Sequence, residues 1–324
     1  MALRIIFCGT PAFAVPSLEL LLRDPDFQIV GVVTQPDRPR GRGQEMHSSP
    51  VKDAAAGSGI PVYQPERIKS DESYEYFKRL APDAVVIIAY GQIIPPRLIK
   101  IPRLGWINLH ASLLPKYRGA APINWAIVNG ETRTGVTTMQ IDMGLDTGPT
   151  LLAHETEIAP DETAPMLAAR LAVAGAPLVA ETLKKLDRSE ITPKPQDGAK
   201  ATTARPLKKE DGRIDWSLSA HRIYNRIRGF EPWPGAYTLF RGKRCDIWGK
   251  AASEAELGAG FKLAPSGDAV ALGAIFATGG EVFVVCGAGT FLRLTFVHLE
   301  GRKRVTAQEF ANGARLEPGE RFGS

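Results

Sequence analysis

The chain has 324 residues, of which 44% are hydrophobic and 23% charged, a composition typical of a globular protein of roughly two domains. No run approaches ~20 apolar residues, so a membrane span is not expected, and the N-terminus resembles a first strand more than a signal peptide. The three scattered cysteines, Cys8, Cys245 and Cys286, form no C-x-x-C pair. They argue against a disulfide framework and predict buried free thiols in a cytoplasmic protein.

Charge is distributed unevenly along the chain. Residues 1–190 carry 20 Lys and Arg against 21 Asp and Glu, whereas residues 191–324 carry 20 against 14, within a net charge of +5. A basic C-terminal part suits contact with a polyanion such as nucleic acid. The same charge distribution fits a solvated basic surface without a polyanionic partner equally well.

The first half of the chain alternates segments of strand and helix character. Strands are predicted at the apolar or β-branched runs 3–9, 27–35, 83–90 and 105–115, and helices at 17–24 and 71–81. The run DAVVIIAY at 83–90 is continuously apolar, as expected for a strand covered on both faces. This alternation predicts an α/β fold with a doubly wound, mostly parallel sheet.

Residues 163–187 have the pattern of a long Ala- and Leu-rich helix that closes the first domain, although Pro177 could interrupt it. The following stretch is rich in Pro, Lys, Thr and Gly and shows no period, which is typical of a linker. We therefore predict an N-terminal domain at 1–189, a linker at 190–209 and a C-terminal domain at 210–316.

The C-terminal domain is predicted to begin with an amphipathic helix at 214–230, with Ser217 or Ser219 near its start. Short strand-like runs separated by glycine-rich turns follow at 236–240, 245–250, 269–273, 281–287 and 291–300. Several short strands with turn signals favour a small β-barrel or sandwich.

The turn after the first strand reads CGTPAFAV, and its glycine, Gly9, raises the question of a dinucleotide site. The G-x-G-x-x-G pattern that lets a backbone approach a pyrophosphate is missing. We interpret the segment as a tight turn from strand to helix.

Asn108 and His110 stand two residues apart at the end of a predicted strand. Because side chains alternate along a strand, both project from one face, and Ser112 would continue the series if the strand persists. Ligands of open α/β sheets bind at the carboxyl ends of strands, so these residues are candidates for a site. Taken alone, such a pair is more often a satisfied turn or core pair.

Two further segments could contribute chemistry. Asp142 and Asp146 lie in the glycine-rich stretch MQIDMGLDTGP, where a carboxylate could meet and orient His110 or simply form a polar turn. Residues 34–52 hold several basic side chains among Pro and Gly and are predicted to be a long irregular loop. Such a loop could grip phosphates or be merely basic and mobile; its basic residues are Arg38, Arg40, Arg42 and Lys52.

The joint occurrence of INLHASLLPKYRGAAPI at 107–123 and GLDTG at 144–148 resembles the folate-dependent formyltransferases. The segments GTPAFAVPSL, TQPDRPRGRGQ, SSPVK, GRIDWSLSA and FEPWPGAY are similar to those of the family members that act on methionyl-tRNA. The similarity extends from about residue 3 to about residue 315, nearly the whole chain.

The resemblance implies transfer of a formyl group from 10-formyltetrahydrofolate to the amino group of initiator methionyl-tRNA, by a cytoplasmic monomer that needs no metal. It implies a Rossmann-like catalytic domain and an OB-like C-terminal barrel that holds tRNA. It assigns catalysis to Asn108, His110 and Asp146. It assigns folate contact to Ser112, Leu113, Leu114 and Pro115, and tRNA contact to the loop with Arg38, Arg40 and Arg42.

Other functions remain open at this point. A formyltransferase for a sugar-nucleotide amine, or a formyltetrahydrofolate hydrolase, would fit the N-terminal motifs. A nucleic-acid-binding module on an inactive α/β scaffold would fit the basic charge but leaves Asn108, His110 and Asp146 without a common purpose. The basic residues Lys116 and Arg118 face either a substrate phosphate or solvent.

Overall fold

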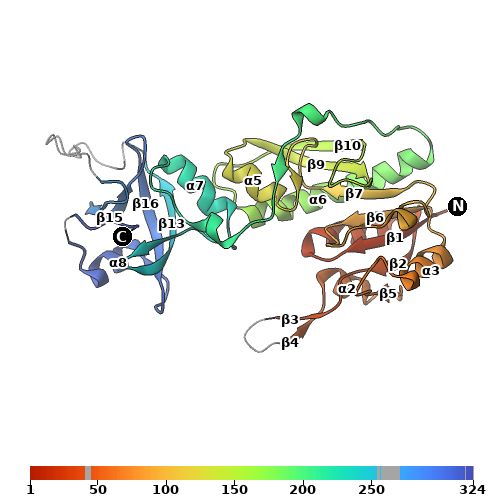
Figure 1. Ribbon diagram of the computed structural model, residues 1–324, viewed down its shortest axis with the longest axis horizontal. Coiled ribbons are helices and arrows are strands. Elements are labelled where there is room, and N and C mark those ends of the chain that lie inside the picture. The colour runs from red at the N-terminus through yellow and green to blue at the C-terminus, as the bar shows by residue number, and fades with distance from the viewer. Residues whose placement is uncertain (41–44, 254–255, 257–270, 318, 324) are drawn as a thin grey trace. The chain divides into compact units, whose positions relative to one another are not determined.

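The computed structural model describes residues 1–40, 45–253, 256, 271–317 and 319–323 (Figure 1). The chain forms two compact units. The first comprises residues 1–122, 133–157 and 166–205, and the second comprises 123–132, 158–165 and 206–324.

The first unit is built on a seven-stranded sheet with the order β10-β9-β7-β6-β1-β2-β5. The five strands from β7 to β5 are parallel, while β9 and β10 run antiparallel at one edge. This confirms the predicted doubly wound, mostly parallel fold. The strands are β1 (Leu3–Gly9), β2 (Phe27–Val33), β5 (Val62–Tyr63), β6 (Ala84–Ile88), β7 (Trp106–His110), β9 (Arg133–Gln140) and β10 (Thr150–Glu157).

Helices and short elements complete the first unit (Figure 1). The helices are η1 (Ala12–Ala14), α1 (Val15–Arg23), α2 (Pro50–Ala55), α3 (Asp71–Leu80), α4 (Pro96–Ile99), α6 (Ala164–Asp187) and η2 (Gly198–Lys200). Two small ladders pair β3 (Arg38–Arg40) with β4 (Glu45–His47), and β8 (Arg118–Gly119) with β11 (Thr203–Ala204).

Strand β7 is fixed by packing on both faces. Trp106 at its start is fully buried, stacks on Phe77 of α3 at 5.3 Å and donates its indole N–H to the Leu98 carbonyl at 2.9 Å. On the other face Leu109 meets α6 at Gly175, where a Cβ would lie 2.5 Å from a Leu109 methyl. Because side chains alternate, Asn108 and His110 share the face that Trp106 anchors.

Helix α6 runs unbroken from Ala164 to Asp187 although Pro177 lies inside it. Its prediction as one long helix is therefore confirmed. By length and apolar composition it is the one helix of the described part of the chain that could cross a membrane. Within the unit, 56% of its most apolar stretch is buried, as in a core helix.

Three local expectations are wrong. The stretch 34–52 is not one irregular loop, because β3 and β4 form a short hairpin and α2 begins at Pro50. Strand β7 ends at His110, so Ser112 does not continue the alternation of side chains along the strand. The run 269–273 lies partly outside the described residues, and its described part is not a strand; β14 begins at Ile275 instead.

The segment after α6 follows the first unit closely. Lys194 and Thr150 exchange backbone hydrogen bonds of 2.8 Å in both directions, and β11 pairs with β8. Residues up to 205 therefore belong to the first unit. The boundaries 1–189, 190–209 and 210–316 stay a prediction.

The second unit is an antiparallel β domain with the strand order β12-β13-β16-β15-β14, and β17 pairs with β16. The C-terminal residues join its two edges, since Gly323 N–H donates to Leu239 of β12 and Phe322 N–H donates to Gly273 beside β14. This agrees with the predicted small barrel. Its elements are α5 (Pro122–Val128), η3 (Lys209–Gly212), α7 (Ala220–Gly229), β12 (Tyr237–Phe240), β13 (Lys243–Ala251), β14 (Ile275–Thr278), β15 (Glu281–Val285), β16 (Phe291–Leu299), β17 (Val305–Thr306) and α8 (Ala307–Ala314).

The cysteines behave as the sequence predicts. All three are buried and unpaired. Burial raises the pKa of the Cys8 thiol well above its usual value, and it raises those of Cys245 and Cys286 to about 12. Thiols held in this neutral form are poor nucleophiles, so these cysteines serve packing.

We expect Gly135→Ala to destabilise the first unit. A Cβ at Gly135 in β9 would lie 2.1 Å from the His154 carbonyl oxygen and 2.6 Å from the Leu113 side chain. Overpacking of this kind costs about 1–3 kcal/mol, measured as a lower free energy of unfolding in a urea titration followed by circular dichroism. The control is Gly198→Ala, where no atom lies within 4 Å. Equal unfolding midpoints for the two variants would contradict the predicted clash.

Candidate active site

His110 is the last residue of β7, and its side chain is 7% exposed. Its Nε2 lies 2.9 Å from the Tyr117 carbonyl oxygen. Because a carbonyl only accepts, Nε2 carries the hydrogen of this bond. The other ring nitrogen, Nδ1, lies 3.6 Å from Asp146 Oδ2, beyond the length of a direct hydrogen bond. Nδ1 is therefore the ring atom left for a reacting group.

Asp146 comes from the loop between β9 and β10, with its side chain 13% exposed. Its backbone is left-handed at φ 52°, a conformation that few side chains adopt. Its Oδ2 accepts a hydrogen bond of 2.8 Å from the Gly119 N–H. The other candidate, Asp142, accepts from Gly144 N–H and the Thr147 hydroxyl, so it shapes this loop as a turn residue.

Asn108 lies on the same face of β7 as His110 and is 8% exposed. Its side-chain amide makes no hydrogen bond to the residues that the structure describes. Its amide atoms are not among the fully buried polar atoms that lack a partner in the described chain, so they reach solvent at this edge. The free amide of Asn108 is thus available to a ligand at this edge.

The segment Ser112–Pro115 is a rigid turn beside these groups. The Thr137 hydroxyl of β9 donates to the Ser112 carbonyl at 2.7 Å and accepts from Leu114 N–H at 3.2 Å. Ser112 is 1% exposed, and its hydroxyl donates to the Lys116 carbonyl at 2.6 Å. The Ser112 hydroxyl is thus engaged in a hydrogen bond within the protein. The side chains of Leu113, Leu114 and Pro115 remain as candidates for an apolar wall of the site.

Some residues at the site were missed in the sequence reading. Tyr117 holds His110, and Gln196 donates to the Asp146 and Gly148 carbonyls at 2.9 and 2.7 Å. Nothing in the local sequence signals Gln196, because it comes from a segment with the composition of a linker. The structure explains the glycine at position 119, since its φ of 122° is open to glycine and a Cβ there would lie 2.5 Å from the Ala204 carbonyl oxygen.

A groove of about 1120 Å³ lies at the carboxyl ends of β1, β2 and β6. Strands β6 and β7 are parallel neighbours with Ile87 opposite Asn108, so the groove and His110 share one edge of the sheet. On its rim, Lys52 pairs with Asp37. The hydrogen bond from Lys52 and, to a smaller extent, the one from Gln64 lower the pKa of the Asp37 carboxyl. Arg38 lines the groove, is exposed, and has no ion-pair partner among the described residues.

Arg40 lies on β3, whose backbone is described, and Arg42 lies outside the described residues. Arg118, by contrast, turns inward: its Nε and Nη2 both contact the Gln196 side-chain oxygen, at 3.0 and 2.8 Å.

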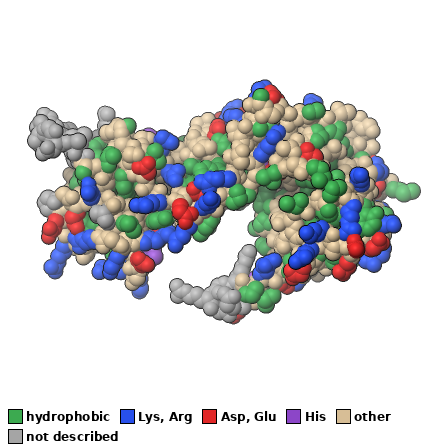
Figure 2. Space-filling view, in the orientation of Figure 1, with side chains coloured by type: hydrophobic (Ala, Val, Ile, Leu, Met, Phe, Trp, Pro, Cys, Tyr) green, Lys and Arg blue, Asp and Glu red, His purple; other side chains and the backbone are tan. Residues whose placement is uncertain are grey.

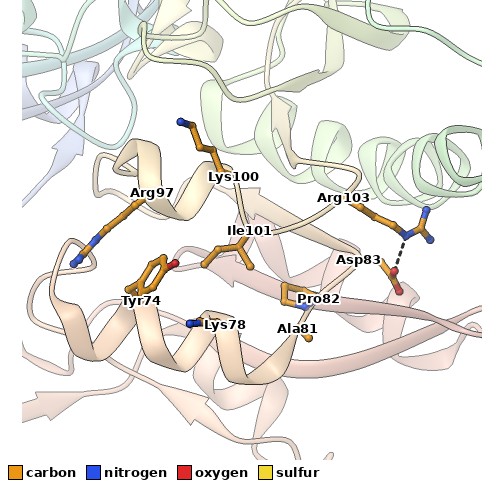
Figure 3. Close-up of a pocket in the computed structure, with 9 residues that line it drawn as sticks. All are labelled: Tyr74, Lys78, Ala81, Pro82, Asp83, Arg97, Lys100, Ile101 and Arg103. Carbon is orange, nitrogen blue, oxygen red and sulfur yellow. Dashed lines mark hydrogen bonds and ion pairs between the residues drawn. The ribbon is translucent and has the colours of Figure 1, made fainter.

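A second hollow lies at the amino ends of β6 and β7, opposite the edge with His110 (Figure 3). It is basic, but its arginines are engaged: Arg103 pairs with Asp83 and Asp187, and Arg97 pairs with Asp71. These ion pairs tie neighbouring elements together. We therefore assign the site to the carboxyl edge. In the described part of the chain, no cluster of three or more His, Cys, Asp or Glu could hold a metal ion.

A doubly wound sheet with polar groups gathered at its carboxyl edge is the framework of an α/β enzyme. Residues 3–183 match the formyl transferase family, and residues 206–315 match the formyl transferase C-terminal domain. The chain belongs to the formyl transferase family.

Curated relatives resemble the chain along its whole length. Methionyl-tRNA formyltransferase of Solibacter usitatus is 52% identical over 99% of both chains. That of Acidobacterium capsulatum is 48% identical over 99% of this chain and 100% of its own.

Solved structures are more distant. The N-formyltransferase of Helicobacter canadensis, in complex with folinic acid and dTDP-3-aminofucose, is 19% identical with a TM-score of 0.66, over 91% of this chain and 99% of its own. Methionyl-tRNA formyltransferase from Clostridium thermocellum is 17% identical with a TM-score of 0.52, over 78% and 94%. At these identities the likeness shows the fold alone.

We expect Thr137→Val to lower the free energy of unfolding by about 1–3 kcal/mol, because the Ser112 carbonyl and Leu114 N–H lose their shared partner. Thermal unfolding of the purified protein measures the loss. The matched control is Thr134→Val in the same strand, a residue that is 4% exposed and whose hydroxyl makes no hydrogen bond to the described residues. If the control loses as much stability as Thr137→Val, the hydroxyl bridge has no specific role.

Proposed function

We propose that the chain transfers the formyl group of 10-formyltetrahydrofolate to the amino group of methionyl initiator tRNA, in the cytoplasm and as a monomer. The observation that carries the proposal is the meeting of His110 and Asp146 beside the unpaired amide of Asn108 at one sheet edge. The substrate follows from relatives 52% and 48% identical along nearly their full length, both named for methionyl-tRNA.

In the reaction the neutral methionyl amine attacks the formyl carbon. A C–N bond forms, the formyl oxygen becomes an oxyanion, and the bond from carbon to the folate nitrogen then breaks. The amine loses one proton and the departing folate nitrogen gains one. Two donors suit the oxyanion: the amide N–H of Asn108, and a proton on His110 Nδ1. Losing one such donor typically costs about 10²–10³ in rate.

Asp146 has an electrostatic role in this scheme. Its carboxylate lies 3.6 Å from His110 Nδ1 and attracts the positive charge that the ring carries while it donates to the oxyanion. The gap leaves the Nδ1 proton available to substrate rather than committed to the carboxylate. Asp146 also stands ready to accept the amine proton, directly or through a water. Holding both substrates at one edge supplies much of the remaining acceleration.

Folate contact is proposed for the turn Ser112–Pro115, with Leu113, Leu114 and Pro115 as its apolar wall. Further exposed apolar side chains, Ile93, Met143 and Leu145, come from loops near this edge and suit a flat pteridine ring. The buried Ser112 hydroxyl supports the turn from within.

Contact with tRNA is proposed for the β3–β4 hairpin with Arg38, Arg40 and Arg42, and for the C-terminal unit. Lys and Arg side chains recur over the face of that unit seen in Figure 2. Arg304 lies over the rings of Trp248 and Phe296 at 4.1 and 4.2 Å, which holds one of these cations in a fixed position. Lys and Arg side chains on the hairpin and on the C-terminal unit suit contact with a phosphate backbone.

The alternatives are less well supported. The N-formyltransferase of Helicobacter canadensis, solved with dTDP-3-aminofucose, is only 19% identical to this chain. Its likeness therefore shows the shared fold and says nothing about the substrate of this chain. Transfer to methionyl-tRNA, with free methionine, a sugar-nucleotide amine and water as competing acceptors, distinguishes the three reactions.

We expect His110→Ala and Asp146→Asn each to slow single-turnover formylation of methionyl-tRNA at saturating folate by about 10²–10³, because each weakens oxyanion stabilisation. Rapid quench followed by acid-urea gel analysis measures the rate. His154→Ala, which removes an exposed histidine of β10, is the control and should match the parent. Parent-like rates in both site variants would refute the catalytic assignment.

We expect Arg38→Ala to raise the KM for methionyl-tRNA several-fold with little change in the KM for folate, because an exposed cation lining the groove is lost. The slope of log Kd against log salt should fall by roughly 1, as for one phosphate contact. Filter binding at several salt concentrations measures it. The control, Arg23→Ala, removes an exposed arginine at the far end of α1. Equal effects on tRNA and folate would argue against phosphate contact.

A further inference from the structure

We propose that Gln196 is a positioning residue for formyl transfer: clamped by Arg118, it holds the loop that presents Asp146 to His110. The inference rests on the proposed catalytic role of Asp146. It concerns a segment, residues 194–204, that carries no chemistry of its own and has the composition of a linker.

The Asp146 loop needs an external hold. Asp146 has a left-handed backbone at φ 52°, which a non-glycine residue keeps only when its surroundings fix it. The Gln196 amide nitrogen supplies that contact by donating to the Asp146 carbonyl at 2.9 Å and to the Gly148 carbonyl at 2.7 Å. An amide has two hydrogens, so both are used on this loop.

Arg118 fixes the orientation of that amide. Its Nε and Nη2 lie 3.0 and 2.8 Å from the Gln196 side-chain oxygen, which leaves the nitrogen of Gln196 facing the loop. Gln196 itself is anchored next to Lys194, whose backbone exchanges two hydrogen bonds with Thr150. The clamp therefore joins β8, the segment after α6 and the β9–β10 loop.

The tripeptide Tyr117–Gly119, with Arg118 at its centre, links the clamp to the reacting groups. The Tyr117 carbonyl accepts from His110 Nε2, Arg118 holds Gln196, and Gly119 N–H donates to Asp146 Oδ2. One tripeptide thus fixes the distance between His110 and Asp146. Gln196 contacts neither His110 nor the Asp146 carboxylate, so it acts through loop position alone.

The test compares Gln196→Ala with the parent in formylation of methionyl-tRNA. We expect kcat to fall by about 10-fold or more, with the KM for folate and for tRNA each within about threefold, because the reacting geometry loosens while substrate contacts stay. Gln28→Ala, an exposed glutamine of β2, is the control and should leave kcat unchanged. A parent-like kcat in Gln196→Ala, or a fall explained by KM alone, overturns the inference.

Gln196→Glu separates positioning from folding. A carboxylate keeps the contact with Arg118 but places an acceptor against the carbonyls of Asp146 and Gly148. We expect a loss of kcat at least as large as in Gln196→Ala, in a variant whose circular dichroism and unfolding midpoint match the parent. A fully active, folded Gln196→Glu would show that the donated hydrogen bonds are dispensable.

A double-mutant cycle distinguishes this inference from the proposed function. If Gln196 acts through Asp146, Gln196→Ala should add less than twofold to the loss in kcat caused by Asp146→Asn. Multiplicative losses overturn the positioning role. If Asp146→Asn alone is fully active, the proposed function fails first; if it is slow while Gln196→Ala is fully active, only the positioning inference fails.

Discussion

The structure of the site depends on the hydrogen bonds made by the tripeptide Tyr117–Gly119. Its first carbonyl fixes which nitrogen of His110 carries a hydrogen, and its last N–H holds the Asp146 carboxylate. The backbone amide and carbonyl are stiff groups, so the two side chains meet in one arrangement without a direct bond between them. The 3.6 Å between Nδ1 and Oδ2 is close enough for charge attraction but too long for a direct hydrogen bond.

Packing below the site gives this arrangement a rigid base. Trp106 and Leu109 hold β7 against helices on opposite faces, and the absence of a side chain at Gly175 lets α6 approach. His110 then stands at the carboxyl end of the strand, with its side chain 7% exposed. The antiparallel strand β9 adds Thr137, whose hydroxyl fixes the turn after His110. The packed residues Trp106 and Leu109 and the polar residue His110 therefore lie within five positions of one strand.

The groups proposed for substrate contact and for catalysis lie on different parts of the chain. The reacting groups stand on a strand end and a clamped loop, whereas the basic groups proposed for tRNA lie on a hairpin and on the C-terminal unit. Phosphate contacts tolerate variable geometry because charge attraction falls off slowly with distance. Stabilising an oxyanion requires donors within hydrogen-bond range, and the hydrogen bonds around His110 and Asp146 fix these proposed catalytic groups in place.

Much of the fold could be predicted from the sequence. Apolar runs and helical periods identified the parallel sheet, the long helix α6 and a small C-terminal β domain, because apolar residues recur at the positions that each element buries. Alternation put Asn108 and His110 on one face, and the motifs in 107–123 and 144–148 indicated the family. Only the tertiary structure decided that Asp146 lies beside His110, that Ser112 turns inward, and that Gln196 and Arg118 meet. The contacts of Asp146 with His110 and of Gln196 with Arg118 join residues 36 and 78 positions apart, and sequence patterns of short period carry no information about such distances.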